Sequence, residues 1–427
     1  MINKVMELKL KVRNKGYSGE VSRKLLKELV SLNGRIGFRG YTKNDIVERS
    51  NGVLTYSPTN IVNNKIINYK NDTYISQDKY KESPEIMVKN NDILFVKTGS
   101  TLGKSALVRN LTEPATINPQ LIVIKSIHVD SDYLAVYLLT DSIQKQVFQV
   151  KIGGAVPTLT ETEIGKFEVK LPSLPEQSAI GSLFRTIDDL LASYKDNLIN
   201  YQSLKATMLS KMFPKAGQTI PEIRLDGFEG EWEKTTLEKS TDRVKSYSLS
   251  RDVETNQDTG LRYIHYGDIH LGKVSMIDDG NSTPYIKTDT KLSEFLQQGD
   301  IIFADASEDY KGIAEVAVIA TTLSEKIVAG LHTIAVRPYS IFDSIFLYYM
   351  FKTQTFRKYG YKVGTGMKVF GISPSNLMKY EFYYPDKKEQ QVIGAYFSNL
   401  DNLINSHQEK ISQLETLKKK LLQDMFI

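Results

Sequence analysis

The 427-residue chain is predicted to have an α+β fold, with two tandem mixed α/β units that are each followed by a long helix. Three observations predict this fold. A helical segment near the middle of the chain is repeated at its end. Short β-branched runs bounded by Gly, Asn or Pro fill the residues before each copy. Both copies carry apolar residues three and four apart, which favours an antiparallel coiled coil between the two helices, with pseudo-twofold symmetry.

Composition excludes several classes of protein. Apolar residues make up 41% and charged residues 25%, which excludes wholesale disorder. No apolar run approaches the ~20 residues that a bilayer requires. Cysteine is absent, which excludes disulfides, thiol nucleophiles and cysteine-based zinc modules. The first five residues lack the apolar stretch of a secretion signal, so a cytoplasmic location is expected. The net charge of +5 is compatible with a nucleic-acid partner but does not require one.

The internal repeat defines the predicted domains. Residues 171–214 align without a gap to residues 384–427, and the shared landmarks are Pro172/Pro385, Glu176/Glu389, Gln177/Gln390, Ile180/Ile393, Gly181/Gly394, Phe184/Phe397, Asp188/Asp401, Met212/Met425 and Phe213/Phe426. Weaker echoes link residues 16–21 to 227–232 and residues 92–95 to 300–303. The predicted boundaries are 1–170 for the first domain, 171–214 for the first helix, 215–383 for a linker and the second domain, and 384–427 for the second helix. The interiors are expected to diverge almost completely, as in two versions of one reader module.

Each interior is predicted to combine strands with short helices. In the first unit, residues 93–96 and 121–124 are expected strands and residues 133–139 an expected helix. In the second unit, the corresponding strands are residues 314–319 and 333–336, and the helix is residues 344–349.

The closing segments are predicted to be helices of about 35 residues, roughly 50 Å long. The seam positions singled out are Ile180, Leu183, Ile187, Leu190 and Asn197 in the first helix, and Ile393, Leu400, Leu403, Lys410 and Leu414 in the second. Asn197 and Lys410 stand at matching places, where a polar seam residue can fix the register of a coiled coil.

Motifs that would indicate catalysis are incomplete. Residues 97–105 (KTGSTLGKS) have three residues between the glycines where a phosphate-binding P-loop needs four. Residues 118–121 (NPQL) lack the second proline and the stacking aromatic of the adenine-methyltransferase motif. Nuclease-like fragments at 168–170 and 385–388 lie in different units, and the five histidines form no helical metal-binding pair. We therefore predict no catalytic residue, no metal site and no cofactor bound by this chain.

Basic and polar residues in the two interiors are the candidate DNA contacts. Arg, Asn and Gln can read base edges, whereas Lys mainly neutralises phosphates. The candidates in the first unit are Arg35, Arg39, Lys43, Lys97, Ser100 and Lys104, with Arg109 nearby in sequence. Those in the second unit are Arg262, His265, Lys273, Lys311, Lys362 and Lys368.

Together these landmarks give the chain a resemblance to the specificity subunits of type I restriction–modification enzymes. The resemblance is carried by residues 221–232 (PEIRLDGFEGEW), by residues 171–177 (LPSLPEQ) and by the Met-Phe ending of both helices. It spans nearly the whole chain. Tyr17 and Val21 replace the aromatic residues that stand at Phe228 and Trp232 of the second unit, and the heptads are unaffected.

The resemblance implies two target recognition domains that each read half of a split DNA site. It also implies that two modification subunits, which bind S-adenosylmethionine and methylate adenine N6, dock on this chain together with restriction subunits. Geometry adds that two readers on one face of DNA are favoured roughly 10 bp apart, which leaves an unread gap near ~6 bp between half-sites of ~4 bp. The divergent interiors favour an asymmetric target. The alternatives are a self-sufficient DNA methyltransferase or nuclease, and a coiled-coil scaffold that binds only protein.

Overall fold

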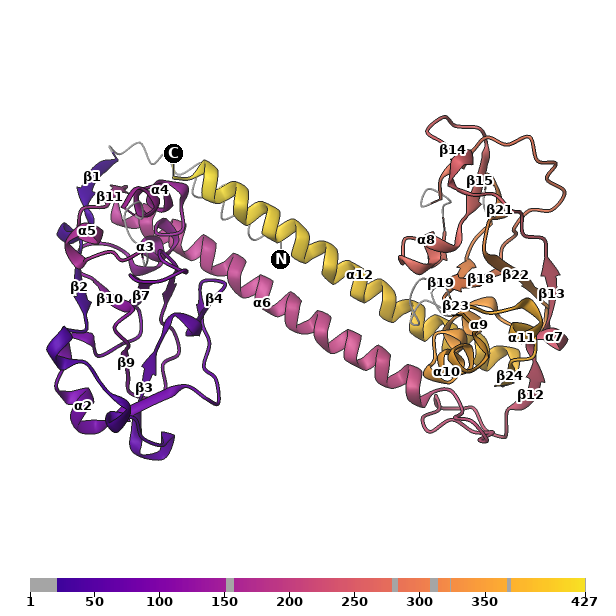
Figure 1. Ribbon diagram of the computed structural model, residues 1–427, viewed down its shortest axis with the longest axis horizontal. Coiled ribbons are helices and arrows are strands. Elements are labelled where there is room, and N and C mark those ends of the chain that lie inside the picture. Colours follow the sequence, from indigo (N-terminus) through magenta and orange to yellow (C-terminus); the bar gives the residue numbers. More distant parts are fainter. Residues whose placement is uncertain are drawn as a thin grey trace. The chain divides into compact units, whose positions relative to one another are not determined.

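The structure is a computed structural model, and it describes residues 21–150, 157–278, 283–307, 314–322, 324–366 and 370–426. The chain divides into two compact units. Unit 1 contains Met1–Lys195 together with Glu409–Ile427, and unit 2 contains Asp196–Gln408. Each unit combines sheets with helices, which confirms the α+β class with two tandem units (Figure 1).

Unit 1 is built on two sheets. The larger is antiparallel, with the order β2 (Val30–Gly34), β10 (Leu121–Ser126), β7 (Ile93–Val96) and β8 (Ser105–Leu107). The smaller has the order β6 (Thr73–Ser76), β3 (Gly52–Tyr56) and β9 (Ala115–Ile117). Two-residue strands β4 (Ile61–Val62) and β5 (Lys65–Ile66) form a hairpin beside them.

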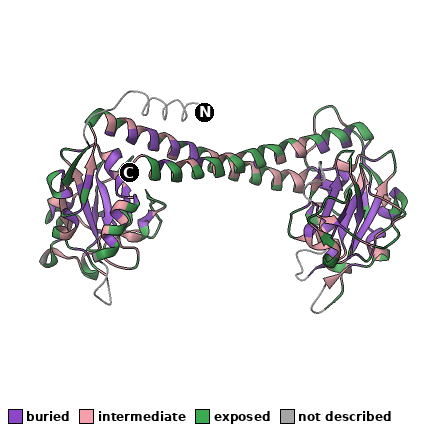
Figure 2. Cartoon of the chain, turned by 90° about the horizontal axis from the view of Figure 1, so that it is seen from above, coloured by how far each residue is buried: buried purple, intermediate pink, exposed green. Residues whose placement is uncertain are grey.

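The apolar runs of β7 and β10 are explained by burial on both faces. Ile122 and Ile124 pack into one core, whereas Leu121 and Val123 pack into a second core on the opposite face. Successive side chains of a strand point to opposite faces, so a strand covered on both sides has no polar alternation. Figure 2 shows these central strands as buried.

Helices cover one face of the larger sheet of unit 1. They are α3 (Ser131–Tyr137), α4 (Asp141–Val150), α5 (Glu161–Gly165) and the first part of α6 (Leu174–Lys211). A two-stranded sheet of β1 (Ser22–Leu25) and β11 (Glu168–Leu171) precedes α6. A short helix, α2 (Gln77–Lys81), follows β6.

Unit 2 repeats this plan with more strands. Its larger sheet has the order β13 (Thr241–Val244), β22 (Thr333–Pro338), β18 (Ile301–Ala304), β20 (Val316–Ile319) and β16 (Met276–Ile277). Its second sheet has the order β14 (Glu254–Thr255), β17 (Tyr285–Ile286), β15 (Leu261–Ile264) and β21 (Lys326–Ala329). The strand predicted at 333–336 is therefore confirmed, as are those predicted in unit 1, and the strand predicted at 314–319 is present over Val316–Ile319.

The remaining elements of unit 2 are six α-helices and two pairs of strands over the described residues, and α9 to α12 and β24 correspond to elements of unit 1. They are α7 (Leu237–Ser240), α8 (Tyr266–His270), α9 (Ser344–Phe351), α10 (Gln354–Val363), α11 (Pro374–Met378) and α12 (Lys387–Asp424), with the strand pairs β12 (Glu233–Thr236)/β24 (Glu381–Tyr384) and β19 (Ala306–Ser307)/β23 (Phe370–Gly371).

Both predicted long helices are present, and segments of the two pack against each other inside each unit. In unit 1, Lys418 Nζ lies 2.5 Å from Asp188 Oδ1, and Lys195 Nζ lies 2.7 Å from Glu415 Oε1. In unit 2, Lys205 Nζ lies 2.5 Å from Asp401 Oδ1. Asp188 pairs with Lys418, and Lys195, which is later in α6, pairs with Glu415, which is earlier in α12. The two segments therefore run antiparallel in unit 1. Coiled-coil packing and pseudo-twofold symmetry stay predictions.

The seam positions differ in burial. Ile180, Leu183, Ile187, Leu190 and Leu414 are buried in unit 1, and Ile393 and Leu400 are buried in unit 2. Asn197 is exposed, Lys410 is partly exposed and Leu403 is 40% exposed. Over the described ranges, every helix is too short or too polar to cross a lipid bilayer.

The structure corrects the expectation that the interiors diverge almost completely. The helices α3, α4 and α5 and the strand β11 each begin 213 positions before α9, α10, α11 and β24. Asp130 caps α3 by accepting a hydrogen bond from Tyr133 N, and Asp343 caps α9 by accepting one from Phe346 N. The ungapped repeat thus extends back to Asp130. Low identity across α4 and α5 conceals it, because apolar core residues there exchange freely while the helix lengths are kept.

Candidate nucleic-acid interface

The candidate residues at the end of β2 and around the β7–β8 loop of unit 1 meet at one end of its larger sheet. Gly34 at the end of β2 pairs with Ile122 near the start of β10, and Leu121 pairs with Val96 at the end of β7. Phe95 pairs in turn with Ser105 at the start of β8. Residues 35–43, 97–104 and 118–120 therefore leave or enter the sheet at the same end, which we call the reader end of unit 1.

Arg35 is buried and holds a reader-end loop together. Its guanidinium donates to Ile117 O at 3.1 Å, to Thr116 Oγ1 at 3.2 Å and to Arg39 O at 3.3 Å. Burial lowers the pKa of Arg35. With its donors directed to groups of this unit, Arg35 positions the loop that presents Arg39 and Lys43. Arg39 is half-buried, and its Nη1 lies 3.6 Å from Glu85 Oε1.

Lys97 is also paired within the unit. Its Nζ lies 2.8 Å from Glu161 Oε1, and its side chain is 15% exposed. Burial alone would raise the pKa of Glu161, but the hydrogen bond from Lys97 keeps it below its usual value. The turn that follows uses Gly99 and Gly103 at φ +106° and +87°, where a side chain would be strained. Residues 97–104 therefore form a Gly-rich turn between β7 and β8.

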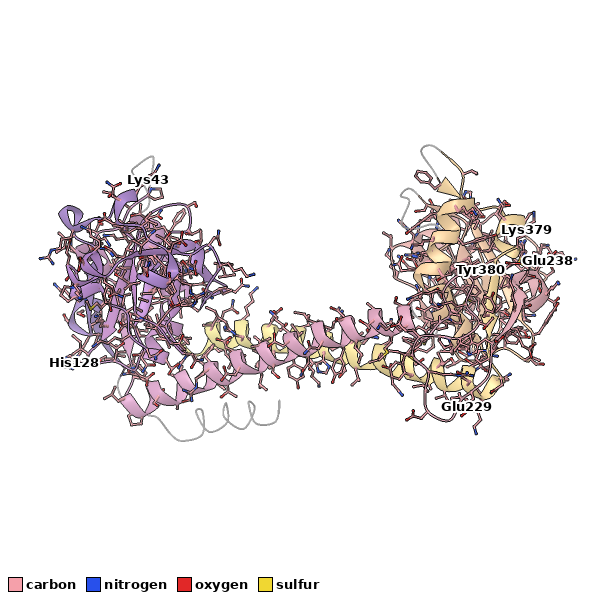
Figure 3. All side chains as sticks on the ribbon, turned by 90° about the horizontal axis from the view of Figure 1, so that it is seen from below. Lys43, His128, Glu229, Glu238, Lys379 and Tyr380 are labelled. Atoms are coloured by element: carbon pink, nitrogen blue, oxygen red, sulfur yellow. The ribbon has the colours of Figure 1, made fainter. Side chains whose placement is uncertain are left out.

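The exposed candidates of unit 1 are Lys43, Ser100 and Lys104 (Lys43 is labelled in Figure 3). Gln120, which the sequence did not single out, is exposed beside them in the turn before β10. Its backbone carbonyl accepts from Lys97 N at 2.9 Å, which ties the two turns together. The signal that identifies Gln120 is its place at the start of a central strand. A lysine, a hydroxyl and an amide of this kind can contact phosphates and base edges.

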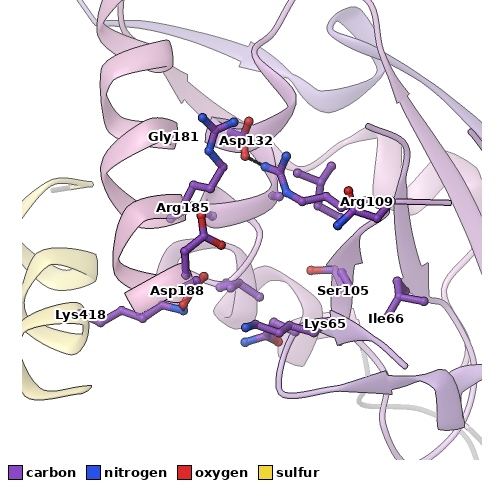
Figure 4. A pocket seen from close by; sticks show the side chains of 17 residues that line it. Lys65, Ile66, Ser105, Arg109, Asp132, Gly181, Arg185, Asp188 and Lys418 are labelled. Atoms are coloured by element: carbon purple, nitrogen blue, oxygen red, sulfur yellow. Dashed lines mark hydrogen bonds and ion pairs between the residues drawn. The ribbon is translucent and has the colours of Figure 1, made fainter. Parts of the chain in front are cut away.

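Arg109 lies in a charged cavity of unit 1. The cavity has a volume of about 300 Å³ and is lined by Arg109, Asp132, Arg185, Asp188 and Ser105, among others (Figure 4). Arg109 forms an ion pair with Asp132. Burial, followed by the nearby Arg185, lowers the pKa of Arg109. These contacts are with α3 and α6, so Arg109 is set apart from the exposed reader-end residues.

In unit 2, two candidates are buried and paired. Arg262 forms an ion pair with Glu325 and donates to Thr283 O, and its guanidinium lies 3.6 Å from the ring centroid of Tyr285. His265 caps α8, because its Nδ1 accepts from Gly267 N at 3.1 Å. Burial, followed by the charge of Arg251, lowers the pKa of His265.

His265 nevertheless lies close to the reader end of unit 2, where β13 and β18 end and β22 begins. Its ring centroid is 4.5 Å from that of Tyr266, which is 5.4 Å from that of His332. His332 Nδ1 lies 3.1 Å from Asp305 Oδ1, just after β18. The exposed Lys245 follows β13. The sequence did not single out His332 or Lys245, although both flank central strands.

The other candidates of unit 2 are dispersed. Lys273 is exposed in the segment after α8. Lys362 is exposed on α10 and lines a separate groove. Lys311 and Lys368 lie outside the described residues. Over the described ranges, His, Asp and Glu side chains nowhere gather in groups of three or more that could hold a metal ion.

Comparison with known proteins gives a consistent family. Residues 26–202 and 248–416 match the type I restriction modification DNA specificity domain, one match for each repeat. The chain is 22% identical over 348 residues to the type I restriction enzyme MjaVIII specificity subunit of Methanocaldococcus jannaschii, covering 79% of each chain. It is 20% identical over 359 residues to the putative MjaX specificity subunit of that organism, covering 82% of this chain and 80% of the other.

The fold agrees with a solved structure as well. A crystal structure of the type I restriction–modification system S subunit from M. genitalium superposes with a TM-score of 0.57 at 13% identity, covering 96% of each chain. The two matched domains, which together span most of the sequence, are those whose central strands carry the reader ends. This chain therefore belongs to the family of type I restriction–modification DNA specificity proteins.

Proposed function

We propose that this chain is the non-catalytic specificity subunit of a type I restriction–modification complex, and that it recognises an asymmetric, bipartite DNA site. The observation that carries the proposal is the combination of a shared scaffold with two different reader ends. The helices from α3 to α6 recur as α9 to α12 at a constant separation. The loops at the ends of the central strands differ in sequence, as residues 97–104 (KTGSTLGK) and residues 305–315 (DASEDYKGIAE) show.

The exposed chemistry of the two reader ends supports unlike half-sites. Unit 1 presents Lys43, Ser100, Lys104 and Gln120. Unit 2 places Lys245, His332 and the partly buried Tyr266 at the same end of its larger sheet. Different donors, acceptors and aromatic rings select different base edges, so one chain would read two sequences.

The proposed complex contains two modification subunits and the restriction subunits. S-adenosylmethionine would be bound by the modification subunits and not by this chain. The repeated part of the scaffold supports two copies of one partner, since a surface that occurs twice can accept the same protein twice.

Methylome sequencing tests the proposal. A host that carries this chain and its modification subunit should show N6-methyladenine in one asymmetric split motif, and deletion of this chain should abolish the mark. In a second arm, the purified chain with S-adenosylmethionine and DNA should transfer no methyl group. Methylation by the chain alone would establish the self-sufficient methyltransferase, and a continuous or palindromic motif would contradict the two-reader proposal.

A further inference from the structure

Each unit carries a groove on the scaffold that recurs between α3 and α12. Groove 1 of unit 1 has a volume of about 830 Å³ and is lined by Thr140, Gln146, Lys166, Glu168 and Phe426, among others. Groove 2 of unit 2 has a volume of about 510 Å³ and is lined by Thr353, Tyr359, Lys379, Glu381 and Phe213, among others. Each groove lies between the α4 or α10 helix, the β11 or β24 strand and the end of a long helix.

The two grooves share several equivalent lining positions. Thr140, Lys166 and Glu168 stand 213 positions before Thr353, Lys379 and Glu381, and Phe213 stands 213 positions before Phe426. In all four pairs the residue type is kept. The neighbouring helix surface changes, since Gln146 is replaced by Tyr359 and Gln149 by Lys362.

Packing explains only some of these identities. Thr140 and Thr353 are buried, and each hydroxyl donates at 2.7 Å to the carbonyl three residues earlier. Phe426 packs against Tyr133, Tyr137 and Phe184, and Phe213 against Trp232, Phe346 and Phe397. Lys166, Glu168, Lys379 and Glu381 are exposed, so the core of neither unit requires them. Because these lysines and glutamates are kept in both copies without a role in the core, we expect both grooves to bind the same ligand.

Both grooves carry more cations than anions. Groove 1 has Lys145, Lys166 and Lys419 against Asp141 and Glu168. Groove 2 has Lys215, Lys234, Lys362 and Lys379 against Glu381, and Lys215 Nζ also lies 3.1 Å from Glu222 Oε2 outside the groove. Lys234 Nζ lies 2.9 Å from Glu381 Oε2, which orients that carboxylate at the groove edge. An acidic segment complements this charge, and the retained glutamate adds a position that a donor group can contact.

The retained lysine and glutamate of each groove lie away from the reader end, which favours a protein over DNA as the ligand of these two residues. Helix α5 begins at Glu161 beside Lys97, at the reader end of unit 1. It ends before Lys166, where Phe167 O accepts from Leu26 N at 2.9 Å, close to the start of β2. In unit 2, Tyr380 O accepts from Leu237 N at 2.9 Å in the same way (Lys379 and Tyr380 are labelled in Figure 3).

We propose that grooves 1 and 2 each dock the same acidic segment of one modification subunit, with Lys166 and Lys379 as the equivalent anchoring cations. This inference rests on the proposed function, because it assumes that two copies of one partner assemble on this chain. Two modification subunits would then bind one chain because the sequence duplication produces two equivalent grooves.

The test uses the full chain co-expressed with its modification subunit, with subunit composition measured by native mass spectrometry. Lys166→Glu and Lys379→Glu should each retain one modification subunit, and the double variant should retain none at concentrations that saturate the unaltered chain. Because like charges placed against each other oppose binding, each reversal should weaken its site about a hundredfold or more. Lys166→Arg combined with Lys379→Arg should retain both subunits.

Lys43→Glu is the matched control, because it reverses an equally exposed charge at a reader end. It should retain two modification subunits and weaken the DNA shift. Circular dichroism melting checks that every variant folds. A double variant that still binds two modification subunits overturns the docking inference and leaves the proposed function standing. A double variant that keeps both subunits but loses DNA assigns the grooves to DNA and also overturns it. An unaltered chain that binds neither modification subunit nor DNA would contradict the proposed function itself.

Discussion

Two buried glutamines show, at the scale of single residues, how the repeat is held. Gln177 Oε1 accepts from Asp130 N at 3.0 Å, and its Nε2 donates to Pro172 O at 2.8 Å. Gln390 makes the same pair of bonds, with Asp343 N and Pro385 O, both at 2.8 Å. One side chain therefore joins the cap of a domain helix to the start of a long helix, which explains why the glutamine of the Glu-Gln landmark is present twice.

Gln390→Ala should lower the free energy of unfolding of unit 2 by about 2–4 kcal/mol, since it leaves a buried N–H and a buried carbonyl without partners. Trp232 is the one tryptophan of the chain, and it is buried in unit 2. Urea unfolding followed by its fluorescence measures the effect. Gln391→Ala is the control, because Gln391 is exposed. Equal unfolding midpoints for the two variants would contradict the role given to Gln390.

His265 makes the stability of unit 2 depend on pH. Burial lowers its pKa below 6.5, so under mildly acidic conditions the unfolded chain binds a proton that the folded chain does not. Stability should therefore fall as the pH drops through 6.5 toward the lower folded pKa. His265→Asn keeps an acceptor for Gly267 N and removes the titration, which should flatten that slope in Trp232 fluorescence melts. His128→Asn, in unit 1, should leave the slope unchanged, and an unchanged slope in the His265 variant would refute the assignment.

For Arg35, Arg262 and His265, the sequence did not predict that the side chain is buried and paired within its own unit. Each is a residue type that binds DNA, and each is buried with partners from its own unit. The partners are backbone carbonyls, an amide and a distant carboxylate, which no local pattern encodes. Exposed candidates such as Lys104 had the same sequence signal, so only the fold separates loop supports from available cations.

The long helices were the most predictable elements. The heptad spacing and the ungapped repeat predicted segments that the structure places at Leu174–Lys211 and Lys387–Asp424. The heptad periodicity predicts an apolar stripe on a helix but not which part of the protein covers it. It therefore predicted Leu403 and Leu414 to be equally buried. Leu414 is 1% exposed in the core of unit 1, whereas Leu403 is 40% exposed.

Leu414→Ala should lower the stability of unit 1 by about 2–4 kcal/mol, because it opens a cavity in the apolar core of that unit. Leu403→Ala should cost under ~1 kcal/mol, since little apolar area is lost and alanine favours the helix. Urea unfolding followed by circular dichroism at 222 nm measures both changes. The Trp232 transition of unit 2 should not move in Leu414→Ala, and similar losses in the two variants would contradict the difference in burial.

At the scale of the whole molecule, the proposed function implies that the length of α6 helps to set the distance between the two half-sites. Residues of both units belong to this one helix. Inserting four residues after Asn197 adds about 6 Å of helix, which corresponds to roughly one or two base pairs. The unread gap should lengthen by that amount while both half-sites stay the same. Methylome sequencing of the insertion mutant measures the gap. An altered half-site would contradict the proposal that the length of α6 sets only the gap.

The composition of unit 1 has a consequence for biosynthesis. Its apolar core includes Leu414, Leu421 and Phe426, which are translated after the whole of unit 2. Unit 2 is one continuous stretch from Asp196 to Gln408, so all of its residues leave the ribosome earlier. The core of unit 1 therefore stays partly uncovered until the last turns of α12 have been synthesised. A nonsense codon soon after residue 408 would leave unit 2 entire and remove part of the core of unit 1.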